Sequence, residues 1–174
     1  VYINGQEVGY SEDSKNSAEF LINKFVKPGK NVLTLKIYRW STGSYLECQD
    51  FWRISGIERD VFLYSQPKAA LKDFRVTSTL DDTYKDGIFK LGVDLRNNGS
   101  TAGNMTLVYE LLDANGKVVA TGEKATNVAA GETRTVSFDQ TLPDVKTWTS
   151  EAPNLYKLVM TVKENGKVNE IIPF

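Results

Sequence analysis

Residues 89–95 read Phe-Lys-Leu-Gly-Val-Asp-Leu, with an apolar side chain at every second position. This alternation has the period of a β-strand, in which successive side chains point to opposite faces of a sheet. The same pattern recurs along the chain, at Met105, Leu107, Tyr109 and Leu111, at Val136 and Phe138, and at Leu158, Met160 and Val162. The sequence therefore predicts an all-β fold in which each strand buries one face.

Turn signals divide residues 67–174 into about seven candidate strands. These signals are Asp86-Gly87, Asn97-Asn98-Gly99, Asn115-Gly116, Ala130-Gly131 and Asn165-Gly166. Their spacing is typical of an immunoglobulin-like sandwich, in which two sheets pack face to face. The paired cysteines of antibody domains are absent, so the prediction rests on the strand pattern alone.

The first 66 residues carry fewer strand signals. Asn4-Gly5 predicts a tight hairpin, residues 32–38 predict a strand with Leu33, Leu35 and Ile37 on one face, and residues 59–64 predict another strand. About four strands would leave sheet edges and an apolar face exposed, so we expect a preceding segment of a longer protein to complete this part. Gln66-Pro67-Lys68 is the predicted joint, which gives domains at residues 1–66 and 67–174.

Composition excludes several classes of function. The 174 residues hold 21 lysines and arginines against 22 aspartates and glutamates, so net charge favours neither nucleic acid nor an anionic membrane as a partner. No apolar stretch approaches the roughly 18 residues that span a bilayer. Histidine is absent, which excludes histidine-based catalysis. Cys48 is the single cysteine and forms no internal disulfide, so the compartment, cytoplasmic or periplasmic in a bacterium, stays open.

Residues 39–61 mix aromatic side chains with both signs of charge and lack strand periodicity. Long irregular loops are often functional, and aromatic faces beside charged groups suit sugars, whose C–H faces stack while their hydroxyls form hydrogen bonds. A structural interpretation is also open. In that interpretation Trp40 and Trp52 fill the core, and the arginines pair with the acidic residues to fix the loop, the residues concerned being Arg39, Arg53, Arg59, Glu47, Asp50 and Asp60.

The same stretch resembles the end of the N-terminal sugar-binding domain in family 2 glycoside hydrolases. The residues that match the family pattern are Asp50, Trp52, Arg53, Gly56, Ile57 and Arg59. Residues 39–41 and 43–47 look like the β-galactosidase branch of the family, as do residues 1–10 with Glu19-Phe20. The closing run from Thr147 to Tyr156 resembles the segment that ends the family's first immunoglobulin-like domain. Residues 80–140 are a generic sandwich and add little to the resemblance.

The resemblance implies a modular enzyme. Residues 1–66 would be the C-terminal half of a galactose-binding-like jelly-roll sandwich, and residues 67–174 an immunoglobulin-like sandwich. The parent would be a retaining β-galactosidase that hydrolyses terminal β-D-galactosides and forms homo-oligomers. Its two catalytic glutamates would lie on a (β/α) barrel of the same chain, so residues 1–174 would hold no catalytic residue and be inactive alone.

The resemblance also implies roles for single residues. Asp50 would contact galactose hydroxyls and help to ligate a sodium ion whose other ligands come from the barrel, and Trp52 would line the sugar site or pack the loop. Glu47, Arg53, Gly56 and Arg59 would support the site, with Gly56 supplying a special backbone angle or a close approach. Magnesium is a further possible ion of the parent, and neither ion would be held by residues 1–174 alone.

Two other functions remain open at this point. β-Sandwich folds also serve as stand-alone carbohydrate-binding modules. Related branches that act on glucuronides or mannosides share Asp50, Arg53 and Gly56, whereas residues 44–47 favour a galactoside.

Overall fold

The computed structural model describes residues 1–12, 16–46 and 55–174, and within them the regular structure is β apart from one short 3₁₀ helix. The all-β prediction is therefore confirmed. The chain divides into two compact units, Val1–Leu63 (unit 1) and Tyr64–Phe174 (unit 2), which are described separately.

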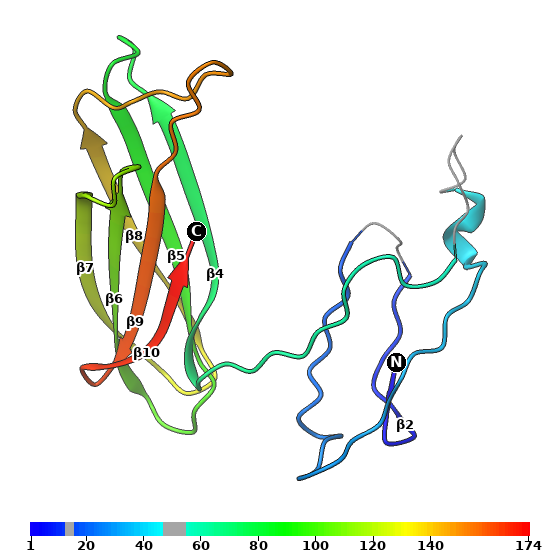
Figure 1. The fold of residues 1–174 in the computed structure, drawn as a ribbon. Coiled ribbons are helices and arrows are strands. Elements are labelled where there is room, and N and C mark those ends of the chain that lie inside the picture. Colours follow the sequence, from blue (N-terminus) through cyan, green and yellow to red (C-terminus); the bar gives the residue numbers. More distant parts are fainter. Residues whose placement is uncertain (13–15, 47–54) are drawn as a thin grey trace. The chain divides into compact units, whose positions relative to one another are not determined.

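Unit 2 is a sandwich of seven antiparallel strands (Figure 1). One sheet has the order β4-β5-β8 and the other the order β10-β9-β6-β7. The strands are β4 (Ala69–Leu80), β5 (Gly87–Asn97), β6 (Gly103–Leu112), β7 (Val118–Val128), β8 (Thr133–Leu142), β9 (Lys157–Glu164) and β10 (Lys167–Pro173). The number of strands agrees with the sequence pattern.

The core of unit 2 lies between the two sheets. All the alternating apolar residues predicted from the sequence are buried there, from Phe89 on β5 to Val162 on β9. Tyr109 is at the centre, with its ring centroid 5.4 Å from that of Phe89 and 4.8 Å from that of Phe138. Its hydroxyl donates a hydrogen bond of 2.7 Å to Gln140 Oε1, so the buried polar atom is satisfied.

The turn between β4 and β5 differs from the predicted position. Gly87 is the first residue of β5 and is buried, and a Cβ on it would lie 2.9 Å from Val145. The turn is formed before it by Asp81, whose carboxylate accepts hydrogen bonds from the Thr83 hydroxyl and from the Lys85 and Asp86 amides. Gly87 is thus required by close packing rather than by turn geometry.

Polar side chains connect the edges of the two sheets in unit 2. Glu170 on β10 accepts a hydrogen bond of 2.8 Å from the Leu71 amide on β4, and Asn169 donates one of 3.1 Å to the Ala69 carbonyl. Gln66 donates to the Leu71 carbonyl and to Glu170. These bonds satisfy edge groups of β4 next to its bulge and fix the start of the sandwich.

Residues 1–12, 16–46 and 55–63 of unit 1 contain one small sheet with the order β2-β1-β3, formed by β1 (Tyr2–Ile3), β2 (Gln6–Glu7) and β3 (Leu33–Thr34). The Asn4-Gly5 hairpin is confirmed, and both residues have positive φ, 51° and 81°. The 3₁₀ helix η1 (Thr42–Tyr45) follows β3.

Two predicted strands of unit 1 are wrong in extent. Of residues 32–38 only Leu33 and Thr34 pair, because they lie opposite the two residues of β1 and no other strand of the described residues lies beside the segment. Residues 59–64 form no strand. An apolar alternation indicates which face a side chain takes, but it does not provide a pairing partner.

Candidate functional site

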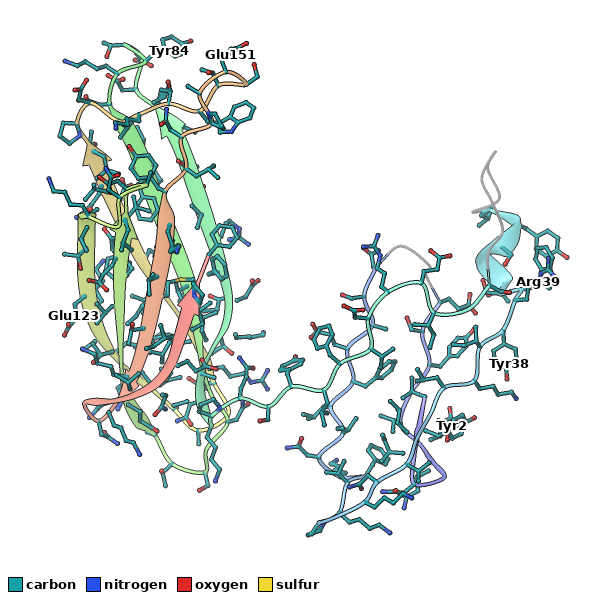
Figure 2. The ribbon with its side chains drawn as sticks, in the orientation of Figure 1. Tyr2, Tyr38, Arg39, Tyr84, Glu123 and Glu151 are labelled. Carbon is teal, nitrogen blue, oxygen red and sulfur yellow. The ribbon has the colours of Figure 1, made fainter. Side chains whose placement is uncertain are left out.

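A cavity of about 470 Å³ lies on unit 1. Aromatic, charged and hydroxyl side chains share its lining, and Figure 2 shows two of them, Tyr2 and Tyr38, on this unit. The lining residues include Tyr2, Tyr10, Glu12, Lys36, Tyr38 and Trp40, together with Glu7, Ser41 and Thr42.

The strand register explains why these side chains share one face. Tyr2 lies opposite both Glu7 and Thr34, while its neighbour Ile3 points the other way and is buried. Because side chains alternate along an extended segment, Lys36 and Tyr38 continue the face of Thr34. The cavity therefore occupies the face opposite to the one on which Ile3 and Leu33 lie.

Glu12 connects two distant segments at the cavity. Its Oε1 accepts a hydrogen bond from the Tyr10 hydroxyl, and its Oε2 accepts one of 2.7 Å from the hydroxyl of Thr42, the first residue of η1. These bonds, Tyr10 first and Thr42 second, lower the pKa of Glu12, and the bond to Glu12 raises the pKa of Tyr10. At neutral pH the carboxylate is ionised and the phenol is protonated.

Two cations lie against aromatic rings of the same segment. Lys36 Nζ is 4.9 Å from the centroid of the Tyr38 ring, and the Arg39 guanidinium is 5.5 Å from the Trp40 ring. A hydrogen bond with Tyr38 is the main cause that raises the pKa of Lys36. Lys36 thus remains charged across the physiological range.

The helix η1 is held at its start by side chains. The Ser41 amide donates a hydrogen bond of 2.9 Å to the hydroxyl of Ser44, and the Leu46 amide bonds to the Gly43 carbonyl at its end. The helix fixes Thr42 next to Glu12 and leads directly into residues 47–54, where the sequence predicts the sugar contacts.

The arrangement provides hydrogen-bond acceptors, donors and aromatic faces in one place. Groups of these kinds can form hydrogen bonds with hydroxyl groups, and Glu12 takes part as an ionised acceptor. Within residues 1–12, 16–46 and 55–174, no group of three or more histidine, cysteine, aspartate or glutamate residues is placed to hold a metal. Sodium ligation by Asp50 and any magnesium site remain predictions.

Most of the predicted site residues lie outside the described residues. Glu47, Asp50, Trp52 and Arg53 belong to this group, as does Cys48. Their predicted roles therefore remain predictions.

The other two predicted site residues are described. Gly56 has a φ of +127°, which side-chain-bearing residues rarely adopt, and a Cβ on it would meet no atom within 4 Å. The backbone angle, and not a close approach, is the reason for glycine at this position. Arg59 is exposed. Support of a sugar site by Gly56 and Arg59 remains a prediction.

The Tyr10–Glu12–Thr42 network was not predicted from the sequence. Thr42 is 30 residues from Glu12, and no motif connects the two. The spacing of Tyr10 and Glu12 was the available signal, because residues i and i+2 of an extended segment point to the same side.

The sequence matches two protein-family models. Residues 1–67 match "Glycosyl hydrolases family 2, sugar binding domain", and residues 69–173 match "Glycosyl hydrolases family 2". No helix in the described part of the chain is long and apolar enough to cross a membrane.

The chain is similar to curated proteins named β-galactosidase. It is 43% identical to that of Priestia megaterium over 94% of this chain and 42% identical to that of Halalkalibacterium halodurans over 99%. The chain spans only 16% of the length of each of these relatives.

A solved structure has the same fold along the whole chain. A β-glucuronidase from Bacteroides uniformis matches 99% of this chain, and 22% of its own chain is covered, with a TM-score of 0.90 and 20% identity. At that identity the likeness shows the fold alone. The family models, which together cover nearly all residues, decide the assignment: the chain belongs to glycoside hydrolase family 2.

Proposed function

We propose that residues 1–174 form a non-catalytic N-terminal part of a retaining β-galactosidase that hydrolyses terminal β-D-galactosides. The observation that carries the proposal is the 42–43% identity to proteins named β-galactosidase over at least 94% of this chain. The chain spans 16% of the length of those relatives, and we expect the catalytic groups in another part of the longer polypeptide. The expected pair is two glutamates about 5 to 5.5 Å apart on a barrel.

The contribution of the chain to this reaction is to position the sugar. The Asp50 carboxylate would accept charge-assisted hydrogen bonds from galactose hydroxyls and present a hard oxygen to sodium. Bonds of this kind orient the substrate against the catalytic glutamates, so their loss lowers turnover as well as affinity. Unit 2 would hold unit 1 and the barrel in place and add no group to the chemistry.

The experiment compares the purified chain with the longer polypeptide. Residues 1–174 alone should not cleave nitrophenyl β-galactoside, and turnover proportional to their concentration would contradict the proposal. In the longer polypeptide, Asp50→Ala should lower kcat/KM by at least about tenfold, the scale of a lost hydrogen bond to a charged group.

The matched control is Glu123→Ala, an exposed carboxylate on β7 of unit 2, which should leave kcat/KM unchanged (Figure 2). Equal kinetics of the Asp50 variant and the native enzyme would remove Asp50 from the site. A preference for nitrophenyl glucuronide or mannoside over the galactoside would keep the enzyme class and replace the substrate.

A further inference from the structure

We propose that Asn165, in the turn between β9 and β10, is a site of spontaneous deamidation, which converts asparagine into aspartate and isoaspartate. The sequence contains four Asn-Gly pairs, at residues 4–5, 98–99, 115–116 and 165–166, and each of them predicts a turn. Their hydrogen bonds separate the last pair from the other three. The modification is independent of the proposed function.

The reaction requires only the asparagine, the next backbone nitrogen and water. The Gly166 nitrogen loses its proton and attacks Cγ of Asn165, which closes a succinimide ring. The bond from Cγ to Nδ2 breaks, and the amide leaves as ammonia with the proton that Gly166 lost. Water then adds to either carbonyl carbon of the ring and breaks its bond to nitrogen, which gives aspartate or isoaspartate and returns a proton to the nitrogen. Glycine has no Cβ, so its nitrogen is open to this attack.

Both reacting groups are accessible at Asn165. Asn165 and Gly166 are exposed. In the part of the chain that the structure describes, neither the Asn165 side chain nor the Gly166 amide forms a hydrogen bond. The backbone amide of Asn165 donates a bond of 3.1 Å to the Asn104 carbonyl, so the turn itself is anchored. Figure 1 shows this turn at one end of the sandwich, between β9 and β10.

The hairpin at Asn4 provides a comparison with the same backbone. Asn4 and Gly5 have φ values of 51° and 81°, and Asn165 and Gly166 have φ values of 49° and 81°. Both pairs thus form turns with two residues of positive φ. A difference in reactivity between the two asparagines must therefore come from their side-chain contacts.

The Asn4 side chain is fixed by three hydrogen bonds. Its Nδ2 donates to the Phe25 carbonyl at 3.0 Å and to Asn31 Oδ1 at 2.8 Å, and its Oδ1 accepts from the Val32 amide at 3.0 Å. These bonds must break before Cγ can turn toward the next nitrogen. Asn4 is therefore protected although its turn has the same conformation.

The pair at residues 98–99 is protected at the attacking nitrogen. The Gly99 amide donates a hydrogen bond of 2.8 Å to Asn97 Oδ1. The Asn98 side chain is also engaged, because its Oδ1 accepts a bond of 2.8 Å from Arg96. An amide held in this way keeps its proton and points away from the asparagine side chain.

The pair at residues 115–116 is protected in the same manner. The Gly116 amide donates a hydrogen bond of 2.9 Å to the Asp113 carbonyl. The Asp113 carboxylate in turn accepts bonds from the Asn115 and Lys117 amides, at 2.9 and 3.0 Å, and so holds the turn closed. Exposure alone therefore does not make an Asn-Gly pair reactive in this fold.

The isoaspartate product lengthens the turn. In isoaspartate the main chain runs through the former side-chain carbon, so one methylene is added between β9 and β10. The native turn has two residues and places Lys167 opposite Glu164. A longer turn no longer fits this register, and β10 is displaced relative to β9.

Strand β10 carries the polar side chains that hold the edge of β4. Glu170 accepts the bond from the Leu71 amide, and Asn169 donates to the Ala69 carbonyl. Displacement of β10 weakens both bonds. Deamidation at Asn165 would thus loosen the contact between the two sheets at the start of the sandwich.

The test is an incubation of the purified chain in mildly alkaline buffer, followed by peptide mass spectrometry of all four Asn-Gly pairs. Deamidation at Asn165 should be at least about tenfold faster than at the other three, because their hydrogen bonds must open first. In urea these bonds are lost, so the four rates should lie within about threefold of one another. Equal rates at Asn165 and Asn4 in the folded chain, or an undiminished lead of Asn165 in urea, would overturn the proposal.

The variant Asp113→Ala tests whether the turn bonds protect. It removes the carboxylate that holds the turn at Asn115 and leaves the turn at Asn165 as it is. Deamidation at Asn115 should become about threefold or more faster, while the rate at Asn165 stays that of the native chain. The matched control is Asp82→Ala, an exposed aspartate of another turn, which should change neither rate. An unchanged rate at Asn115 in Asp113→Ala would overturn the reason for singling out Asn165.

Hydrogen exchange of the separated isoaspartate form tests the effect on β10. The Leu71 amide should exchange about tenfold faster than in the fresh chain, because its acceptor on Glu170 is displaced. Asn165→Asp adds the charge without the extra methylene and should leave this exchange unchanged. Equal exchange of Leu71 in the isoaspartate form and the fresh chain would overturn the link between the turn and β4.

Discussion

Unit 2 buries its hydrophobic residues in one cluster that extends from Ala69 to Val162, whereas Ile3 is the one buried hydrophobic residue in the described part of unit 1. Many large apolar side chains in the described part of unit 1 are instead exposed, Leu33 by 49% and Ile37 by 51% among them. Burial of apolar surface is the main favourable term in folding. Unit 2 is therefore stabilised by its own core, while unit 1 presents surface for other groups to cover.

We expect the largest difference in the free energy of unfolding between two Leu→Ala variants, one in each unit. Leu107→Ala, fully buried on β6, should lower the free energy of unfolding of unit 2 by about 2 to 5 kcal/mol, from lost transfer energy and a cavity. Leu33→Ala, half exposed on β3, should change the free energy of unfolding by no more than about 0.5 kcal/mol. Thermal and urea unfolding of both variants measure this. A cost of several kcal/mol for Leu33→Ala would show that unit 1 has a packed core of its own.

Two glycines of unit 2, Gly122 on β7 and Gly92 on β5, lie on different sheets and have different surroundings. A Cβ on Gly122 would lie 2.6 Å from Tyr109 and 2.9 Å from Phe138, so Gly122→Ala should cost about 1 to 3 kcal/mol of stability. A Cβ on Gly92 would meet only Ser137 Oγ, at 3.9 Å. Gly92→Ala should therefore be neutral or slightly stabilising, as measured by urea unfolding. A loss for Gly92→Ala equal to that for Gly122→Ala would contradict this packing.

A smaller effect is expected from the buried hydroxyl of unit 2. Tyr109→Phe removes the bond to Gln140 and should cost about 1 kcal/mol. Burial also raises the pKa of Tyr109, so the folded state holds this proton more tightly than the unfolded state. Its contribution to stability is complete below the ordinary tyrosine pKa and declines as pH rises above about 10. Between about pH 9 and 11 the free energy of unfolding of Tyr109→Phe should therefore fall less than that of the native chain, as measured by unfolding curves. Tyr84 is exposed, and Tyr84→Phe should show the same fall as the native chain.

The smallest effect concerns the turn before β5. Hydrogen bonds, that from Thr83 first, lower the pKa of Asp81 to about 2. The stabilisation from this carboxylate is therefore present above the ordinary aspartate pKa, about 3.9, and is lost as pH falls toward 2. Asp81→Asn should flatten the dependence of the unfolding temperature on pH between 4 and 2. The neighbouring variant Asp82→Asn is the control, and an equal flattening by both would contradict the assigned role of Asp81.

Sequence patterns predicted unit 2 far better than unit 1. In unit 2 the alternation from Phe89 to Leu95 is repeated on several strands, and each strand finds a neighbour of similar length, so the pattern and the pairing agree. In unit 1 the alternation from Leu33 to Ile37 is as clear, but β1 offers only two residues for pairing. The face of each side chain was therefore predictable and the length of the strand was not.

The candidate site was predictable only in its general position. The irregular run after Arg39 indicated a sugar-binding region, and Trp40 does line the cavity. Tyr10 and Glu12 reach the cavity through a contact with Thr42, which depends on the course of the chain between residues 12 and 42 rather than on a local motif. Neither periodicity nor turn chemistry contains that information.

Hydrogen exchange of the native chain tests the contrast between the two units most directly. We expect amides of β5, β6 and β9 to exchange only through global unfolding of unit 2, and amides of β1 and residues 33–38 to exchange at least about a hundredfold faster through local opening. Equal protection of the strands in both units would contradict the account, because unit 1 would then be as stable by itself as the sandwich that follows it.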